Sequence, residues 1–519
     1  MDKKYLQQFV LTKTNENLFG WKHDIVLGFN LYTHPALEVT KAVFKNKQIY
    51  LLGSIYDWER PLKTNQEIID SIGTSQSMSD FFSQLLNHGG HYIIIYSDTQ
   101  NMFIIGDATS SREIYYDLEF SIFGSQPKLL CEFICPIPYS DIDAIDFYSS
   151  KVFNDTKLFL GDTTHLSNIK HLLPNTYIDV IKKEIKRYFP INNIHPQKMS
   201  EVVPKICNIL RGFIIAAEHR KKLLYAITSG YDSRLLFLAG MGTNQTIQQV
   251  NKKMNKMDGQ QLQKTDNKDF SVGNRYFIYK HKHMNNNHHD IRIPKLLTNL
   301  FGKSFEIIDD LDEFDDVSHS IDFPINIPRR SKYYRNYLYI NGNISEIAKN
   351  QYSIRKYITP YVLASIRGYN GLKYPIKIYS TWINDIISIC ETKGYNIADM
   401  FNWEDSKGIW FAKAFSHDVA LGIDSFTPYN SHNLLSLLLS VDARYRNKYY
   451  HKLYHKIMLE FDKNALKYPI NPCFKSNIYK LLTVLKIFNI LKIIYLKYGF
   501  KSFFQKIKRG NKNDKKRLL

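Results

Sequence analysis

The sequence predicts a multidomain α/β protein, and three observations support that class. A chain of 519 residues is too long for one ordinary core, which favours about two to four domains. From 25 to about 130, short runs of β-forming residues alternate with turn residues. After residue 222, strand-like and helix-like segments alternate in the order β-α-β-α-β, which predicts a parallel sheet with crossover helices.

Composition narrows the class of partner and the compartment. The formal net charge of +20 favours an anionic partner, which could be a nucleotide, a nucleic acid, an acidic sugar or an anionic membrane surface. Five scattered cysteines are too few for a disulfide-stapled secreted protein, so we expect a reducing cytoplasm. The first residues, MDKKYLQQFVLTK, lack the apolar core of a signal peptide, so no export is expected.

The N-terminal part of the chain is predicted to be rich in strands, at 25–32, 48–53, 91–97 and 102–106. The stretch GGHYIIIYSDTQNMFIIGDATSSREIYY, 89–116, predicts a hairpin, a turn and a further strand. This stretch resembles the central hairpin of the glutaminase domain of class II amidotransferases. The resemblance implies an N-terminal nucleophile (Ntn) hydrolase-like αββα domain over residues 1–190.

The same resemblance predicts that this domain is inactive as a glutaminase. In the family, the nucleophile is a Cys directly after the initiator Met, where a free amine activates the thiolate. Here the second residue is Asp2, and no Cys occurs before Cys131. We therefore expect residues 1–190 to form a degenerate glutaminase-like domain.

Residues 161–189 resemble the segment that joins the two domains of that family. Asn175, in the stretch LLPN, stands in for a turn Gly, because Asn tolerates a positive φ. A domain boundary near 190 to 200 follows. A helix is expected over 201–219.

The stretch KLLYAITSGYDSRLLFLAG, 222–240, predicts a buried strand, a turn of small residues and a helix. Backbone N–H groups at such a helix start are unpaired and the helix dipole is positive there, so phosphate is a natural ligand. The candidate binding residues are Thr228, Ser229, Gly230, Asp232 and Ser233. A structural turn with an ordinary N-cap is the alternative.

This turn resembles the SGGxDS pyrophosphate loop of the asparagine synthetase-like ATP pyrophosphatases (PP-loop family). Thr228 replaces the first Ser and keeps its hydroxyl, and Ser229 replaces the first Gly with the next smallest suitable residue. The resemblance implies an adenine-nucleotide α-hydrolase-like domain with a parallel sheet over residues 200–475. It also implies that Asp232 is a Mg²⁺ ligand and that the other turn residues contact pyrophosphate.

A second turn, in YLYINGNISEIAKNQY, 337–352, follows another predicted strand. It resembles the SGDGSDE loop that closes over ATP and magnesium in the same family. Gly342 and Ser345 match that loop, and Glu346 falls on its metal-binding Asp. Asn343 falls on an acidic residue with a proposed general-base role, so we take Asn343 as a candidate catalytic residue whose role differs from that of the family. A helix start capped by Asn and Ser is the structural alternative.

Four further features complete the set of candidates. Residues 400–446 resemble the α-helical part of asparagine synthetase-like proteins, and their ordered positions are expected to be structural: Asp418, Asp424, Pro428, Tyr429 and Asn430. Lys475 lies near the place where the family presents a basic residue to the β- and γ-phosphates, so it is a candidate catalytic residue. A polar loop is expected over 242–268. Four histidines could ligate a metal, although their loose spacing favours a solvated loop: His281, His283, His288 and His289.

Residues 476–500 combine apolar residues with lysines that recur every five or six positions, and residues 501–519 form a strongly basic tail. These lysines exclude a bilayer-spanning helix. Peripheral docking on an anionic membrane is one interpretation. A packed helix followed by a disordered basic tail is the other.

The resemblance implies an ATP-dependent carbon–nitrogen ligase that uses ATP and Mg²⁺. It would activate the carboxylate of a small molecule or sugar, such as a uronic acid in surface polysaccharide synthesis, as an acyl-adenylate. Ammonia or another amine would then form an amide. One alternative is a tRNA-modifying PP-loop enzyme, which the net charge suits but which the glutaminase-like half and the lack of a Cys pair near the loop oppose. A non-catalytic pseudoenzyme scaffold is the other alternative, favoured by Asp2 and Asn343.

Overall fold

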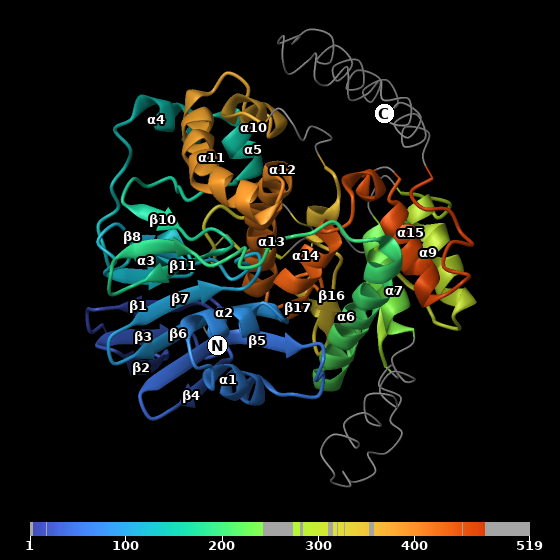
Figure 1. Cartoon of the computed structure of the whole chain (residues 1–519), viewed down its shortest axis with the longest axis horizontal. Coiled ribbons are helices and arrows are strands. Elements are labelled where there is room, and N and C mark those ends of the chain that lie inside the picture. The colour runs from blue at the N-terminus through green and yellow to red at the C-terminus, as the bar shows by residue number, and fades with distance from the viewer. Residues whose placement is uncertain are drawn as a thin grey trace.

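The computed structural model describes residues 4–16, 18–241, 273–280, 284–309, 315–318, 320–325, 327, 329–351, 358–448 and 450–472. Within these residues, the chain forms two six-stranded antiparallel sheets and one five-stranded parallel sheet. Figure 1 shows the antiparallel sheets, in blue and teal, to one side of the green helices α6 and α7. The predicted α/β class is confirmed.

The two antiparallel sheets use strands from the first part of the chain. The first has the order β10-β8-β9-β1-β3-β2, with strands Phe9–Thr12 (β1), Lys22–Val26 (β2), Phe29–Thr33 (β3), Tyr115–Asp117 (β8), Ile122–Gly124 (β9) and Ile169–His171 (β10). The second has the order β12-β11-β7-β6-β5-β4, with strands Val39–Val43 (β4), Lys47–Asp57 (β5), His88–Asp98 (β6), Met102–Gly106 (β7), Thr176–Asp179 (β11) and Glu184–Arg187 (β12).

One predicted strand is wrong. The expected single strand at 25–32 is a hairpin, in which β2 pairs antiparallel with β3. Leu27 and Gly28 form its turn with φ angles of 45° and 80°, and Gly adopts such angles without steric cost. The predicted strands at 48–53, 91–97 and 102–106 are confirmed within β5, β6 and β7.

Alternating side chains hold the two antiparallel sheets together. Tyr50 and Leu52 on β5 point into the core between the sheets, whereas Ile49 and Leu51 point to the opposite face, as expected for a strand with period two. Helices Asn65–Gly73 (α1) and Met78–Leu85 (α2) contribute to the core on that opposite face. Helix Pro127–Leu130 (α3) packs on β8 and β9 of the first sheet, and Ile142–Tyr148 (α4) and Lys151–Thr156 (α5) join the same core. The layers are therefore helix, sheet, sheet, helix.

The parallel sheet has the order β15-β14-β13-β16-β17. Helix Met199–Arg220 (α6) precedes the sheet. The strands, with two of the helices between them, are Leu223–Ala226 (β13), Tyr231–Gly240 (α7), Arg275–Tyr279 (β14), His289–Leu300 (α9), Glu306–Ile308 (β15), Leu338–Ile340 (β16) and Ser425–Phe426 (β17). Leu223 and Leu224 lie in different cores, so both faces of the sheet are covered, which is usual for parallel sheets. The predicted β-α-β-α-β alternation is confirmed.

The remaining helices are Ser331–Tyr333 (η1), Ser345–Ala348 (η2), Pro360–Ile366 (α10), Lys373–Lys393 (α11), Ile397–Phe401 (α12), the π-helix Asn402–Lys407 (η3), Gly408–Ala420 (α13), His432–Leu439 (α14), Ala443–Arg446 (η4) and Lys452–Phe461 (α15). None of the helices in the described part of the chain is long and apolar enough to cross a membrane. The polar loop predicted at 242–268 and the tail at 476–519 lie outside the described residues. The predicted domain boundary near 190 to 200 stays a prediction.

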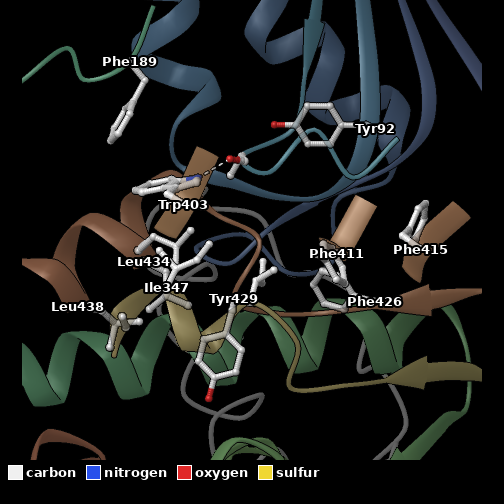
Figure 2. Packing of buried hydrophobic residues seen from close by; sticks show 14 of the residues in the cluster. Tyr92, Phe189, Ile347, Trp403, Phe411, Phe415, Phe426, Tyr429, Leu434 and Leu438 are labelled. Atoms are coloured by element: carbon white, nitrogen blue, oxygen red, sulfur yellow. Dashed lines mark hydrogen bonds between the residues drawn. The ribbon is translucent and has the colours of Figure 1, made fainter. Parts of the chain in front are cut away.

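Aromatic and aliphatic side chains from both parts of the chain pack into one cluster, which Figure 2 shows. Phe189 and Trp403 lie against each other with ring centroids 5.0 Å apart. Trp403 Nε1 also donates a hydrogen bond to the carbonyl oxygen of Ala108 at 2.7 Å. This contact joins the loop after β7 to η3.

A buried carboxylate lies beside this cluster. Glu404 is fully buried and accepts bidentate hydrogen bonds from Arg187 at 2.5 and 3.0 Å. Trp382 Nε1 and Asn175 Nδ2 donate to the same carboxylate at 2.9 and 2.8 Å. Asn175 has a φ of 69°, which confirms that it accepts the positive φ predicted for its turn. The four donors connect the β11–β12 hairpin with α11 and η3.

We expect Glu404→Gln to lower the free energy of unfolding by about 3 kcal/mol, because it leaves the Arg187 guanidinium without a counter-charge in the interior. Urea denaturation of the full chain measures this change. Glu391→Gln, on an exposed position of α11, removes the same charge and should change stability by less than about 0.5 kcal/mol. Equal effects of the two substitutions would contradict the role of this network.

Candidate functional site

The two predicted ligand loops follow neighbouring parallel strands. β13 pairs with β16, with Leu223 opposite Leu338 and Tyr225 opposite Ile340. The carboxyl ends of the two strands therefore lie at one edge of the sheet. β14 and β15 extend the sheet beyond β13, whereas β16 and β17 lie on the other side, so the strand order reverses between β13 and β16. In open α/β sheets, ligands bind outside the carboxyl ends of the strands at such a switch point.

The two loops contact each other through Asp232 of α7. Ser345 Oγ donates a hydrogen bond to Asp232 Oδ1, and Lys349 Nζ donates to Oδ2 at 2.7 Å. A Cβ atom added to Gly342 would lie 2.7 Å from Asp232 Cβ and 3.0 Å from its carbonyl carbon. The fold thus brings three predicted residues, Asp232, Gly342 and Ser345, into one place.

The turn before α7 is held by its own hydroxyl groups. Thr228 N–H donates to Ser233 Oγ at 3.0 Å, and the two hydroxyl oxygens lie 3.0 Å apart. Gly230 N–H donates to Thr228 Oγ1 at 3.2 Å. Gly230 is the N-cap residue of α7 and offers no side chain to cap it. The first turn of α7 thus keeps N–H groups and a positive dipole end for an anion.

Ser229 has a different environment from the other turn residues. It is fully buried, and its N–H and Oγ both donate to Asp290 Oδ1, at 2.9 and 2.6 Å. Its carbonyl oxygen accepts from the Asn471 N–H at 3.2 Å. Asp290 and Asn471 were not among the residues predicted from the sequence. Asp290 lies next to the predicted histidine cluster, and that position was the only local signal for it.

His288, His289 and Asp290 form a group whose ligand atoms lie within 4.8 Å of one another. His288 Nδ1 also accepts the Asp290 N–H at 3.3 Å and so caps α9. The other two histidines of the predicted cluster, His281 and His283, lie outside the described residues. The group offers nitrogen and oxygen ligands of the kind that divalent transition metals accept.

Glu346, the second predicted metal ligand, forms an ion pair with Lys407 of η3. Desolvation raises the pKa of Glu346, but the charges of Lys407 and Lys349 outweigh it, so its pKa lies below the ordinary value. Desolvation lowers the pKa of Lys448, which lies in the same charge cluster. The two candidate carboxylates, Asp232 and Glu346, therefore lie among three lysines that were not predicted from the sequence.

The remaining candidates have structural contacts or are not described. Asn343 N–H donates to Asn341 Oδ1 at 3.1 Å, and its carbonyl oxygen accepts from Thr427 Oγ1 at 3.0 Å. Asn430 donates to Asp107 at 2.9 Å across the junction with the antiparallel sheets. Lys475 lies outside the described residues.

Helix α7, which follows this loop, is also held by residues near the C-terminal end of the described chain. Arg234 of α7 is fully buried and donates to the carbonyl oxygens of Tyr468 at 2.8 Å and Pro469 at 3.0 Å. Burial lowers the pKa of Arg234 to about 10. These bonds hold α7 against residues 465–471, the segment that also contacts Ser229.

Comparison of the chain with models of known protein families found no match, and neither did comparison with curated protein sequences.

We expect Gly342→Ala to lower the free energy of unfolding by about 1 to 3 kcal/mol, because the new methyl group overlaps Asp232 and must move one loop. Thermal denaturation monitored by circular dichroism measures this loss. Asn343→Ala is the matched control at the next position. Its backbone hydrogen bonds remain, so its effect should stay below about 0.5 kcal/mol; a loss as large as that of Gly342→Ala would contradict the close contact.

Proposed function

We propose that this chain is an ATP-dependent ligase of the asparagine synthetase type, which activates a substrate carboxylate and joins it to an amine. The observation that carries the proposal is the contact of the loops after β13 and β16 through Asp232 and Ser345, at the switch point of a parallel sheet. In this proposal, residues 1–190 are a degenerate Ntn-type glutaminase domain. Residues 200–475 are a PP-loop ATP pyrophosphatase domain.

The turn residues bind the pyrophosphate half of ATP. The free N–H groups at the start of α7 and the hydroxyl groups of Thr228 and Ser233 donate to phosphate oxygens. Ser229 is buried and donates a hydrogen bond to Asp290, so its side chain supports the conformation of the turn. Lys349, whose ammonium lies 2.7 Å from Asp232, supplies positive charge beside the leaving pyrophosphate, where an oriented cation stabilises the transition state.

Asp232 and Glu346 would hold Mg²⁺ in this site. Mg²⁺ prefers carboxylate and phosphate oxygens, and both carboxylates lie within one cluster of lysines. The residues fit a magnesium–triphosphate complex because lysine ammonium groups and phosphate oxygens are complementary. When bound, the ion would neutralise charge that develops on the leaving pyrophosphate.

The reaction has two steps. A carboxylate oxygen of the substrate attacks the α-phosphorus of ATP, and the bond from that phosphorus to the bridging oxygen breaks to release pyrophosphate. The amine nitrogen then attacks the acyl carbon, loses a proton and displaces AMP. Because Asp2 stands where the glutaminase family has its Cys, the nitrogen comes from free ammonia, from a separate glutaminase or from an amine on the substrate.

A non-catalytic scaffold is the second candidate, and the ion pairs favour it. Lys349 and Lys407 already neutralise the two carboxylates that would bind magnesium. Asn343 in place of an acid points the same way. On this alternative, the lysines replace the metal and the site has no adenylation activity.

ATP–pyrophosphate exchange distinguishes the two candidates. We expect exchange that depends on one member of a panel of carboxylates, including aspartate, glutamate and uronic acids, and on Mg²⁺. Asp232→Ala should reduce the exchange rate about 100-fold or more, because it removes a ligand that acts on the developing charge.

Asp70→Ala is the matched control for that substitution, because Asp70 is exposed on α1 and far along the chain from both loops. Its exchange rate should equal that of the unaltered chain. Absence of exchange with every acid, or equal rates for Asp232→Ala and Asp70→Ala, would overturn the ligase proposal. ATP binding without exchange would support the scaffold.

A further inference from the structure

A polar cavity of about 620 Å³ lies between the second antiparallel sheet and the parallel sheet. Its wall is formed by β5, by the end of α6, by the starts of β16 and β17, and by α13. The volume is in the range of small-molecule sites, about 300 to 1,000 Å³. The charged residues of the wall are Glu38, Lys63, Arg112, Arg220, Lys221 and Asp424.

Arg112 reaches this cavity across Gly53 of β5. A Cβ atom at Gly53, which has a φ of 106°, would collide with Arg112 Nε and with the carbonyl oxygen of His91. Arg112 Nε donates to that oxygen at 3.0 Å, and the guanidinium lies 5.4 Å from the ring centroid of Phe415. The glycine is therefore required for the position of this arginine.

Arg112 has no acidic partner among the described residues. Its other hydrogen bonds go to the carbonyl oxygen and the Oε1 atom of Gln7, at 3.5 and 3.3 Å. Burial lowers its pKa to about 10, and the more distant acidic groups compensate only in part. Arg112 is half-buried, and a partly desolvated guanidinium without a counter-ion is unfavourable. An anion in the cavity would stabilise it.

Arg220 faces the same cavity from the end of α6. It stacks on Tyr56 of β5, with the guanidinium 4.3 Å from the ring centroid. It donates to Asn65 Oδ1 at 2.7 Å and to the carbonyl oxygen of Lys63 at 2.9 Å, and it also has no acidic partner among the described residues. Two arginines thus line one cavity, and each has more N–H donors than the hydrogen bonds described above use.

The two acids of the wall already have partners. Asp424 forms an ion pair with Lys221. Glu38 accepts hydrogen bonds from Asn65 Nδ2 at 2.8 Å and from Ser54 Oγ at 3.2 Å. The charge that is left over in the wall is positive.

We propose that this cavity binds a small organic dianion, whose carboxylate or phosphate oxygens are held by Arg112 and Arg220. Planar guanidinium groups match both kinds of oxyanion through paired hydrogen bonds. Lys63 adds a third positive charge at the wall.

This site is separate from the proposed adenylation site. Lys221, Leu338 and Asp424 lie at the amino ends of β13, β16 and β17, whereas Asp232 follows the carboxyl end of β13. The anion would therefore bind at the opposite edge of the parallel sheet, as a ligand additional to ATP.

Isothermal titration calorimetry at constant ionic strength tests the proposal. The probes are succinate, glutarate, glycerol 3-phosphate and inorganic phosphate, with succinamide as the uncharged match of succinate. We expect at least one oxyanion to bind with a Kd of about 1 mM or tighter and succinamide not to bind. Binding of the dicarboxylates alone, or of the phosphates alone, identifies which oxyanion the site takes.

Arg112→Gln and Arg220→Gln should each weaken binding about tenfold or more. The ammonium of Lys63 forms no hydrogen bond among the described residues, so Lys63→Gln should have little effect on folding. This substitution removes a positive charge from the same wall and should weaken binding severalfold. Arg335→Gln, at an exposed position, removes one positive charge elsewhere and should leave binding unchanged. Asp232→Ala should also leave it unchanged, which separates this site from the ATP site.

Three results would overturn the proposal. They are the absence of binding by every oxyanion, equal binding of succinate and succinamide, and unchanged affinity in Lys63→Gln together with both arginine variants. Melting curves of the variants establish that each one is folded before its affinity is compared. Loss of ATP–pyrophosphate exchange has no bearing on these outcomes.

Discussion

The parallel pairing of β13 with β16 determines where both proposed sites lie. Because parallel strands run in one direction, the pairing of Leu223 with Leu338 puts the loops that contain Asp232 and Ser345 at one edge of the sheet. The same pairing puts Lys221 and the start of β16 at the opposite edge, on the wall of the cavity. A shift in the register between β13 and β16 would move the two loops apart and would also displace the residues that form the cavity wall. The positions of both proposed sites therefore depend on the parallel sheet.

The two edges of that sheet differ in their charged groups. At the carboxyl edge, Asp232 and Glu346 are paired with Lys349 and Lys407, and Lys448 adds a further positive charge to the same cluster. In the proposed ligase, the phosphates of ATP and Mg²⁺ would replace these ion pairs. At the amino edge, Arg112 has no acidic partner within the described residues, so a bound anion would balance the charge. The wall of the cavity thus carries part of the positive charge of the chain.

The candidate site could be predicted only in part. Gly342, Ser345 and Asp232 carry a local pattern of small residues and an acid after a buried strand, and the fold brings them together. Asp290 and Lys349 escaped prediction, because a single charged residue without a repeated pattern looks like any solvated side chain. Their partners are 61 and 117 positions away along the chain, and only the folded chain makes such pairs visible. Lys475 was predicted only from its place in the order of the motifs, and it lies outside the described residues.

The sequence by itself determined the α/β class, the longest strands and the turns that need small residues, because hydrophobic periodicity and turn chemistry are local properties. Asn175 is an example, since its tolerance of positive φ marked a turn that the fold contains. Tertiary structure alone decided that 25–32 turns back as a hairpin, that Glu404 collects four donors and that two arginines meet in one cavity. These features depend on contacts between residues far apart in the chain, and such contacts leave no periodic signal in the sequence.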